Sequence, residues 1–396
     1  MSKGFYEFFC PVKVVAGEAA LEHIPYELTN LGASRPLLVT DKGVRGAGLV
    51  DHVVAACEAG GIKVDIVFED VPPDSAVEVV REIAQLYNRE GCDALIGVGG
   101  GSVIDTCKGV NILVSEGGLD LSRYAGAGVL KRPLKPFVVV PTTAGTGSEV
   151  TSVAVIADRV KGVKLPFSSG YLLPNAAILD PRMTLTLPPH ITAATAMDAM
   201  THAVEAYTCL ARNPLSSAYA SAAVKKISEN LPRVLENGAD VQARLELAQA
   251  STMAGIAFSN SMVGLVHALG HALGAVCHIP HGVCMNLFLP YVLEFNLAKG
   301  TIREPLGELL LPLAGAEVYA RTPADQRADK ALEVIREMRD TLWKACKLPR
   351  TLRETGKVER EQLNRIAEVA LDDGSIMFNP AEASLNEVKA LLDKAW

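Results

Sequence analysis

The chain has 396 residues, of which 49% are hydrophobic and 21% charged, with a formal net charge of −7. This length predicts about two globular domains of roughly 100–200 residues each, and the apolar content excludes disordered, collagen-like and coiled-coil classes. The acidic balance, without a run of Lys or Arg, argues against nucleic acid as a partner. No run of about 18 uncharged apolar residues occurs, so we expect no membrane span.

The cysteines and the N-terminus indicate the cellular compartment. Eight cysteines are scattered along the chain without a CxxC pair. The first residues, MSKGFYEFFCPVKVV, lack the long apolar core and the small-residue cleavage site of a signal peptide. Reduced, mostly buried thiols are expected in such a chain. We therefore predict a cytoplasmic protein.

The first half of the chain alternates short apolar runs with amphipathic stretches. Strands are expected at residues 36–40, 63–68, 94–98 and 137–140, and helices at 44–59, 75–90 and 102–115. Uniformly apolar runs are typical of strands that helices cover on both faces. The alternation predicts right-handed crossovers and hence a Rossmann-like α/β domain with an open, mostly parallel sheet. The runs at 150–157 and 176–179 are candidates to extend this sheet.

The residue pattern changes after the sequence Leu187-Pro188-Pro189. Alanine-rich helical patterns follow, at residues 192–211, 215–229, 241–258, 264–276, 324–344 and 359–371. Alanine is the best helix former and allows close helix packing, whereas the two prolines do not continue a helix or strand interior. We predict an α/β domain over residues 1–186 and an all-helical domain over residues 187–396.

Two polar loops follow predicted strands in the first half. One contains Gly100, Gly101 and Ser102 and opens a helix; the other is PTTAGTGSE at residues 141–149. Backbone N–H groups at a glycine turn and a helix N-terminus bind phosphate well, and loops after neighbouring strands meet at one sheet edge. A nucleotide diphosphate site is predicted, with tight structural turns as the alternative. Asp41 follows another strand, where its carboxylate would favour NAD over NADP. The alternative role of Asp41 is to cap a helix.

Histidines are concentrated in the second half. Four of the eight lie between positions 267 and 281, and His202 follows Asp198 by four residues. His267 and His271 have the same spacing, which places both members of each pair on one helix face. Such pairs in apolar helices suggest a divalent metal held by oxygen and nitrogen donors, with Fe²⁺, Zn²⁺ or Mn²⁺ as suitable ions. The spacing leaves open whether His271 or His281 completes the set.

Four ordered segments together resemble the iron-dependent (group III) alcohol dehydrogenase family. They are GGGSVIDTCK at 99–108, PTTAGTGSEVT at 141–151, MDAMTHAVEAY at 197–207 and VHALGHALGAVCHIPHG at 266–282. The resemblance implies the dehydroquinate synthase-like architecture of that family, with an N-terminal domain that binds NAD and a helical domain that holds one divalent metal. Fe²⁺ is implied before Zn²⁺, and a homodimer or higher homo-oligomer is expected.

The resemblance also implies a role for individual residues. The metal ligands would be Asp198, His202, His267 and His281, with His271 in the proton path near the nicotinamide. The cofactor would contact Gly100, Gly101, Ser102, Thr142, Thr143, Thr151 and Lys164, with Asp41 at the adenosine ribose. Two positions depart from the family pattern: Asp74 stands where many members have Asn, and His278 stands where another residue is expected. We interpret His278 as a partly exposed loop residue.

The function implied is an NAD-dependent alcohol dehydrogenase. Hydride would pass from a small primary alcohol or diol to C4 of the nicotinamide, giving the aldehyde, while the metal polarises the substrate oxygen. The reverse reaction reduces an aldehyde. A glycerol dehydrogenase-like or dehydroquinate synthase-like enzyme on the same fold is the alternative, and a non-catalytic metal- or nucleotide-binding protein is a third. The TTAGTGSE motif and the Asp/His set favour the alcohol dehydrogenase.

Overall fold

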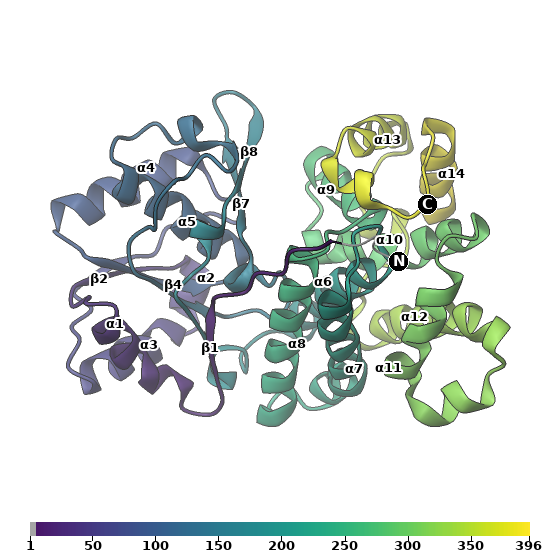
Figure 1. Ribbon diagram of the computed structural model, residues 1–396, viewed down its shortest axis with the longest axis horizontal. Helices are drawn as coiled ribbons and strands as arrows, with labels where there is room; N and C mark the ends of the chain where they lie inside the picture. Colours follow the sequence, from purple (N-terminus) through teal and green to yellow (C-terminus); the bar gives the residue numbers. More distant parts are fainter. Residues whose placement is uncertain (1–4) are drawn as a thin grey trace. The chain divides into compact units, whose positions relative to one another are not determined.

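The computed structural model describes residues 5–396, which belong to two compact units (Figure 1). Cys10–Thr186 form an α/β unit, and Leu187–Trp396 form a helical unit. Phe5–Phe9 group with the helical unit, unlike the expected division at residue 186 alone. Two contacts explain this grouping: the Phe9 N–H donates to Asn260 Oδ1 at 2.7 Å, and the ring of Phe8 stacks on Tyr219.

The α/β unit contains the predicted parallel sheet. Its strands are β1 (Lys13–Ala16), β2 (Pro36–Val39), β3 (Ile66–Phe68), β4 (Ala94–Gly99), β6 (Phe137–Pro141) and β9 (Ala176–Leu179). They are ordered β1-β9-β6-β4-β2-β3, and every neighbouring pair is parallel. The run at 176–179 does extend the sheet, as β9. Strand β1 was not predicted, because it lies at the edge and is mostly exposed, so its sequence lacks a buried apolar run.

Helices cover both faces of this sheet, as Figure 1 shows. On one face α1 (Ile24–Asn30) and α3 (Leu49–Ala59) pack against alternate strand residues such as Leu38 and Ile96. On the other face lie α4 (Val77–Arg89) and α5 (Gly101–Glu116). The stretch 44–59, predicted as one helix, is split into α2 (Lys42–Gly46) and α3 by Gly48, whose φ of 74° is a left-handed conformation.

A second, three-stranded sheet was not predicted. It contains β5 (Gly126–Ala127), β7 (Val153–Asp158) and β8 (Val163–Ser168) in the order β5-β8-β7, with β7 antiparallel to β8. The expectation that the run at 150–157 extends the main sheet is therefore wrong. The chain turns back after Asp158, so β7 pairs with β8 and packs on α5 instead.

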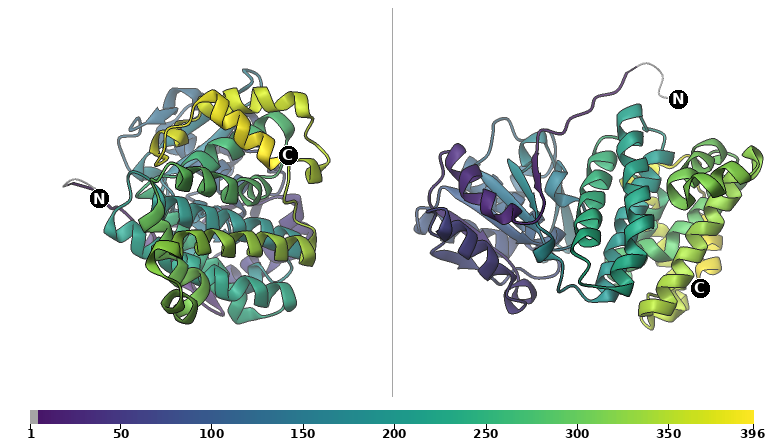
Figure 2. Two further views of the ribbon diagram at one scale, coloured as in Figure 1. Left: turned by 90° about the vertical axis from the view of Figure 1, so that its right-hand side faces the viewer. Right: turned by 90° about the horizontal axis from the view of Figure 1, so that it is seen from below.

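The helical unit consists of helices α6 to α14. They are α6 (Pro189–Thr208), α7 (Pro214–Glu236), α8 (Val241–Ser259), α9 (Leu265–Cys277), α10 (His281–Ala298), α11 (Arg303–Arg321), α12 (Arg327–Cys346), α13 (Leu363–Leu371) and α14 (Leu385–Ala395). Helices α6, α7 and α8 lie side by side (Figure 2). Prolines inside α10 and α11 explain why the sequence pattern missed those helices. Among the described residues, no helix is long and apolar enough to cross a membrane.

Candidate metal centre

Three helices bring the four predicted ligands together. Asp198 and His202 lie one turn apart on α6, His267 lies in the first turn of α9, and His281 begins α10. One donor atom from each of these residues lies within 4.8 Å of the other three. Asp198, His202 and His267 are buried, while the His281 side chain is 37% exposed. The structure thus forms one compact O/N donor cluster from segments about 70 residues apart.

The turn between α9 and α10 places His281 in this cluster. His278 ends α9 in a left-handed conformation, with φ 54° and ψ 39°, and its N–H donates to the Gly274 carbonyl. Pro280 then precedes α10, and its fixed φ suits the residue just before a helix. His278 is exposed and lies outside the cluster, as a loop residue would. The left-handed residue and the proline form the connection between α9 and α10. The HIPHG sequence is explained by this connection, without a metal-binding role for His278.

Buried polar atoms in the cluster lack partners. Asp198 Oδ1, His202 Nδ1 and His267 Nε2 have no hydrogen-bond partner among the described residues. His281 Nε2 lies 3.3 Å from Asp198 Oδ1, and His202 Nδ1 lies 3.7 Å from it. Leaving such atoms buried and unsatisfied costs several kcal/mol, on the order of 1–3 each. The residues therefore fit a bound cation that would satisfy them.

The charge states of the cluster suit a divalent cation. Burial lowers the pKa of His202 to about 3 and the pKa of His267 well below its ordinary value. Burial would raise the pKa of Asp198, but the imidazoles of His202 and His281 bring this pKa well below its usual range. The buried imidazoles are therefore neutral and the carboxylate is ionised at neutral pH. Neutral imidazole nitrogens and a carboxylate oxygen are ligands for Fe²⁺ and Zn²⁺.

A second buried carboxylate, Glu205, was missed by the sequence analysis. Its Oε2 lies 2.5 Å from His267 Nδ1, and its Oε1 accepts the Val266 N–H at 2.7 Å. Burial raises the pKa of Glu205 to about 7. The signal was present in the sequence, because Glu205 follows Asp198 by seven residues and shares its face of α6.

His271 lies beside the cluster without joining it. Its ring stacks on that of His281 at 5.4 Å, and its Nδ1 lies 2.8 Å from Asp373 Oδ2. Burial would raise the pKa of Asp373, but the hydrogen bond with His271 lowers it to about 2. Asp373 was not predicted, because it belongs to a C-terminal segment without a recognisable motif. The place of His271 in a proton path stays a prediction.

The two polar loops of the α/β unit meet at the carboxyl edge of its sheet. Gly100 joins β4 to α5, whose first residues are Gly101 and Ser102. The Thr142 N–H after β6 donates to the Gly99 carbonyl at 3.1 Å. A Cβ atom on Gly101 would lie 2.9 Å from Cγ2 of Thr146, so the loops approach as closely as glycine permits. The Ser102 hydroxyl donates to the Pro73 carbonyl. The backbone of this edge, rather than that hydroxyl, is therefore available to a phosphate.

Four further predicted cofactor residues differ in their surroundings. Thr143 is half-buried in the second loop, whereas Thr151 is 2% exposed and its hydroxyl accepts from Lys108 Nζ at 2.9 Å. Lys164 is exposed on β8, in the small sheet. Asp41 caps α2, because its Oδ1 accepts the Val44 N–H at 2.9 Å. Contact of these side chains with a cofactor stays a prediction.

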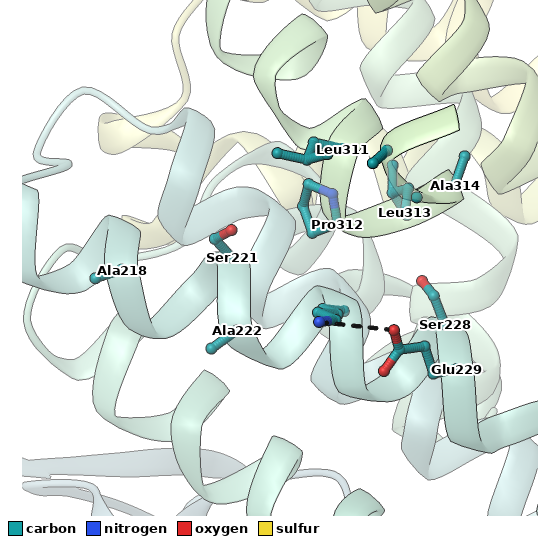
Figure 3. A pocket seen from close by; sticks show the side chains of 12 residues that line it. Ala218, Ser221, Ala222, Ser228, Glu229, Leu311, Pro312, Leu313 and Ala314 are labelled. Carbon is teal, nitrogen blue, oxygen red and sulfur yellow. Dashed lines mark ion pairs between the residues drawn. The ribbon is translucent and has the colours of Figure 1, made fainter. Parts of the chain in front are cut away.

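A groove lies between α7 and α11, away from the predicted site residues. It is lined by small side chains, among them Ser221 and Ala222, by Pro312 and by the ion pair of Lys225 with Glu229 (Figure 3). None of the predicted metal, cofactor or proton-transfer residues lines it. The groove is therefore separate from the Asp/His cluster and from the polar loops.

Comparison with known proteins agrees with this geometry. Residues 11–181 match the model of the iron-containing alcohol dehydrogenase family, and residues 192–396 match its C-terminal region. The chain belongs to the iron-containing alcohol dehydrogenase family. This family membership confirms the resemblance that the four sequence motifs indicate.

Individual relatives match over their whole length. The chain is 36% identical to the NAD-dependent methanol dehydrogenase of Bacillus methanolicus, over 98% of this chain and 99% of that protein. It is also 36% identical to the 1,3-propanediol dehydrogenase of Klebsiella pneumoniae, over the full length of both. A crystal structure of a 1,3-propanediol oxidoreductase superposes with a TM-score of 0.93 at 36% identity, covering 99% of this chain and 100% of that one. The predicted fold class, a parallel α/β domain followed by a helical domain, is confirmed.

Proposed function

We propose that this chain oxidises a small primary alcohol or diol to the aldehyde, and catalyses the reverse reduction, with NAD as the hydride acceptor. It is an NAD-dependent alcohol dehydrogenase that uses a divalent metal, as its family and its full-length relatives indicate. The observation that carries the proposed site is the convergence of one buried carboxylate and three imidazoles within 4.8 Å. The methanol and 1,3-propanediol named for the relatives support a small alcohol as substrate.

In this proposal Asp198, His202, His267 and His281 hold the cation, with iron preferred to zinc. When bound there, a divalent cation supplies Lewis-acid polarisation of the alcohol oxygen. Asp198 contributes the negative charge, and burial keeps the imidazoles of His202 and His267 neutral and able to donate lone pairs. No sulfur ligand belongs to the cluster among the described residues, which suits a catalytic site rather than a zinc finger.

His271 is the proposed proton carrier. Asp373 accepts a hydrogen bond from Nδ1 of this imidazole, so Nε2 is the atom that exchanges a proton with the substrate or with water. Because the His271 side chain is 46% exposed, a proton received at Nε2 can pass on to solvent. The Asp373 carboxylate orients the ring in the same way as the acidic member of a catalytic triad.

The α/β unit is proposed to hold NAD. Gly100 and Gly101 open α5, whose first N–H groups and positive dipole end suit the pyrophosphate. The loop with Thr142 and Thr143 would contact the cofactor from the neighbouring strand, as would Thr151 and Lys164. Asp41 would accept hydrogen bonds from the adenosine ribose. The chain is further proposed to act in the cytoplasm as a homodimer or a higher homo-oligomer.

The test combines metal analysis with a substrate screen. The enzyme is purified without oxygen, its metal content is measured, and NADH formation is followed with short alcohols, diols and glycerol. Asp198→Ala and His267→Ala should lose the metal and the activity, while NAD binding to the α/β unit is retained. His190→Ala, at an exposed histidine of the same helix α6, is the matched control and should keep both. Full turnover in either cluster variant would overturn the metal assignment.

The same screen separates the relatives on this fold. An enzyme of the dehydroquinate synthase type would return its NAD unchanged and form no NADH with any alcohol. A glycerol dehydrogenase would prefer glycerol to the simple alcohols. Tight binding of NAD and metal without turnover on any of these substrates would indicate a non-catalytic protein.

A further inference from the structure

Glu205 joins two helices of the cluster through two contacts. It lies on α6, and both of its carboxylate oxygens reach the first turn of α9: Oε1 accepts the Val266 N–H at 2.7 Å, and Oε2 lies 2.5 Å from His267 Nδ1. The side chain is buried, with 4% of the residue exposed. A Cβ atom on Gly264 would lie 3.1 Å from Glu205 Oε1, so the chain entering α9 passes close to the carboxylate. Two bonds at one end leave Glu205 little freedom to move.

The chemistry of these contacts selects one tautomer of His267. When Glu205 is ionised, its carboxylate only accepts hydrogen bonds, so the proton of a neutral His267 imidazole must then reside on Nδ1 to make the contact with Oε2. The lone pair is then on Nε2. That nitrogen is buried, has no hydrogen-bond partner among the described residues, and belongs to a ring that stacks on His202 with centroids 4.5 Å apart. The unprotonated Nε2 of His267 thus belongs to the Asp198 cluster.

We propose that Glu205 is a positioning residue of the metal centre, which holds His267 in the Nδ1–H tautomer and orients its Nε2 as a ligand. This inference rests on the proposed function, since it requires a cation at the Asp/His cluster. Carboxylates that accept from the far nitrogen of a ligating histidine raise its basicity and fix its ring, and their loss typically lowers metal affinity by about 10- to 100-fold. Glu205 does not itself belong to the donor cluster.

Glu205→Gln separates positioning from simple packing. Glutamine has nearly the same shape but only one acceptor oxygen, whereas two groups face the side chain: the Val266 N–H and His267 Nδ1. If the oxygen keeps the bond to Val266, the amide NH₂ faces Nδ1 and favours the tautomer with the proton on Nε2. That tautomer has no lone pair directed at the cluster. The variant therefore retains the side-chain volume and loses the selection of the ligating tautomer.

A second cap of α9 provides the matched control. Asn379 Oδ1 accepts the Leu265 N–H at 3.2 Å, one residue before the bond that Glu205 makes. Asn379→Ala removes this acceptor from the start of α9 but leaves the contact of Glu205 with His267 intact. Asn379→Ala thus perturbs the same helix end without changing the partner of His267 Nδ1, whereas Glu205→Gln changes that partner.

The experiment titrates full-length, chelator-stripped protein with Co²⁺ and follows the visible absorption of the bound ion. We expect Glu205→Gln to bind Co²⁺ about 10- to 100-fold more weakly than the wild type. Asn379→Ala should change affinity less than about threefold, since it leaves the ligands and their tautomers unaltered. Equal binding by the wild type and Glu205→Gln would overturn the proposal, as would an equal loss in both variants. If wild-type protein fails to bind Co²⁺, or His267→Ala binds it as well as wild type, the proposed function fails instead.

A second measurement does not depend on the folding of any variant at residue 205. Nitrogen NMR of metal-free wild-type protein, labelled in histidine, reports which ring nitrogen carries the proton, and His267→Ala identifies the resonances. The proposal requires the proton of His267 on Nδ1. A proton on Nε2 would overturn it even if Glu205→Gln does not fold.

Discussion

Gly282 lies next to His281, at a close contact between α10 and α6. A Cβ atom at residue 282 would clash with the carbonyl oxygen of Ala194 and lie 2.6 Å from its carbonyl carbon, whereas ordinary contact begins at 3.4 Å. Both atoms belong to helix backbone, so Gly282→Ala can be accommodated only if the helices separate by about 1 Å, since protein interiors are close-packed. His281 would move with α10, while Asp198 would stay with α6.

The expected effect on the metal site is large. Functional metal sites hold their ligand distances within about 0.2 Å, so a displacement of about 1 Å removes His281 as a ligand. We expect Gly282→Ala to bind Co²⁺ at least about 10-fold more weakly and to lower the free energy of unfolding by roughly 1–3 kcal/mol, the usual cost of overpacking. Titration with Co²⁺ and urea unfolding of the metal-free chain measure the two quantities separately.

Gly270→Ala is the control for this prediction. A Cβ atom on Gly270 would also clash, but with Cε of Met285, the end of a flexible side chain that can change rotamer. Alanine also stabilises a helix interior by about 0.5–1 kcal/mol relative to glycine. We therefore expect Gly270→Ala to keep its metal affinity and to unfold within about 1 kcal/mol of wild type. Unchanged affinity in Gly282→Ala, or an equal loss in Gly270→Ala, would refute the argument that backbone contact sets the spacing of α6 and α10.

Two predictions concern the α/β unit. Burial lowers the pKa of Lys108 from 10.5 to about 8. Between these two pH values the unfolded chain binds a proton that the folded chain does not. Lys108 therefore makes the free energy of unfolding rise as the pH rises from about 8 to 10.5. The difference in unfolding free energy between wild type and Lys108→Met should therefore shift in favour of wild type across that window, by at most about 1.4 kcal/mol per pH unit. A constant difference in urea unfolding would contradict this. Asp41→Ser keeps an acceptor for the Val44 N–H but removes the negative charge, so the preference for NAD over NADP should fall at least about 10-fold in calorimetric titrations. An unchanged preference would leave Asp41 as a helix cap alone.

Much of the fold was predictable because local periodicity reports burial. The apolar runs at β2, β4 and β6 indicated a parallel sheet, and the alanine-rich pattern indicated the helical unit. Edge strand β1 was not predictable, because this mostly exposed strand has no distinctive apolar run. The run that contains β7 was noticed, but its pairing with β8 depends on where the chain turns.

The candidate site shows the same division between local and distant information. The four-residue spacing of Asp198 and His202 places both on one face of α6, because a helix repeats every 3.6 residues. Nothing in that spacing distinguishes His271 from His281 as the partner of His267. In the structure His281 lies in the cluster, whereas His271 pairs with Asp373, about a hundred residues further along the chain.

The sequence by itself therefore determined on which helix face Asp198, His202, His267 and His271 lie. Only the tertiary structure decided which faces meet and showed that Glu205 contacts His267 from another helix. The physical reason is that a helix face is set by local backbone geometry, while the approach of two helices is set by contacts between residues far apart in sequence, such as Gly282 and Ala194.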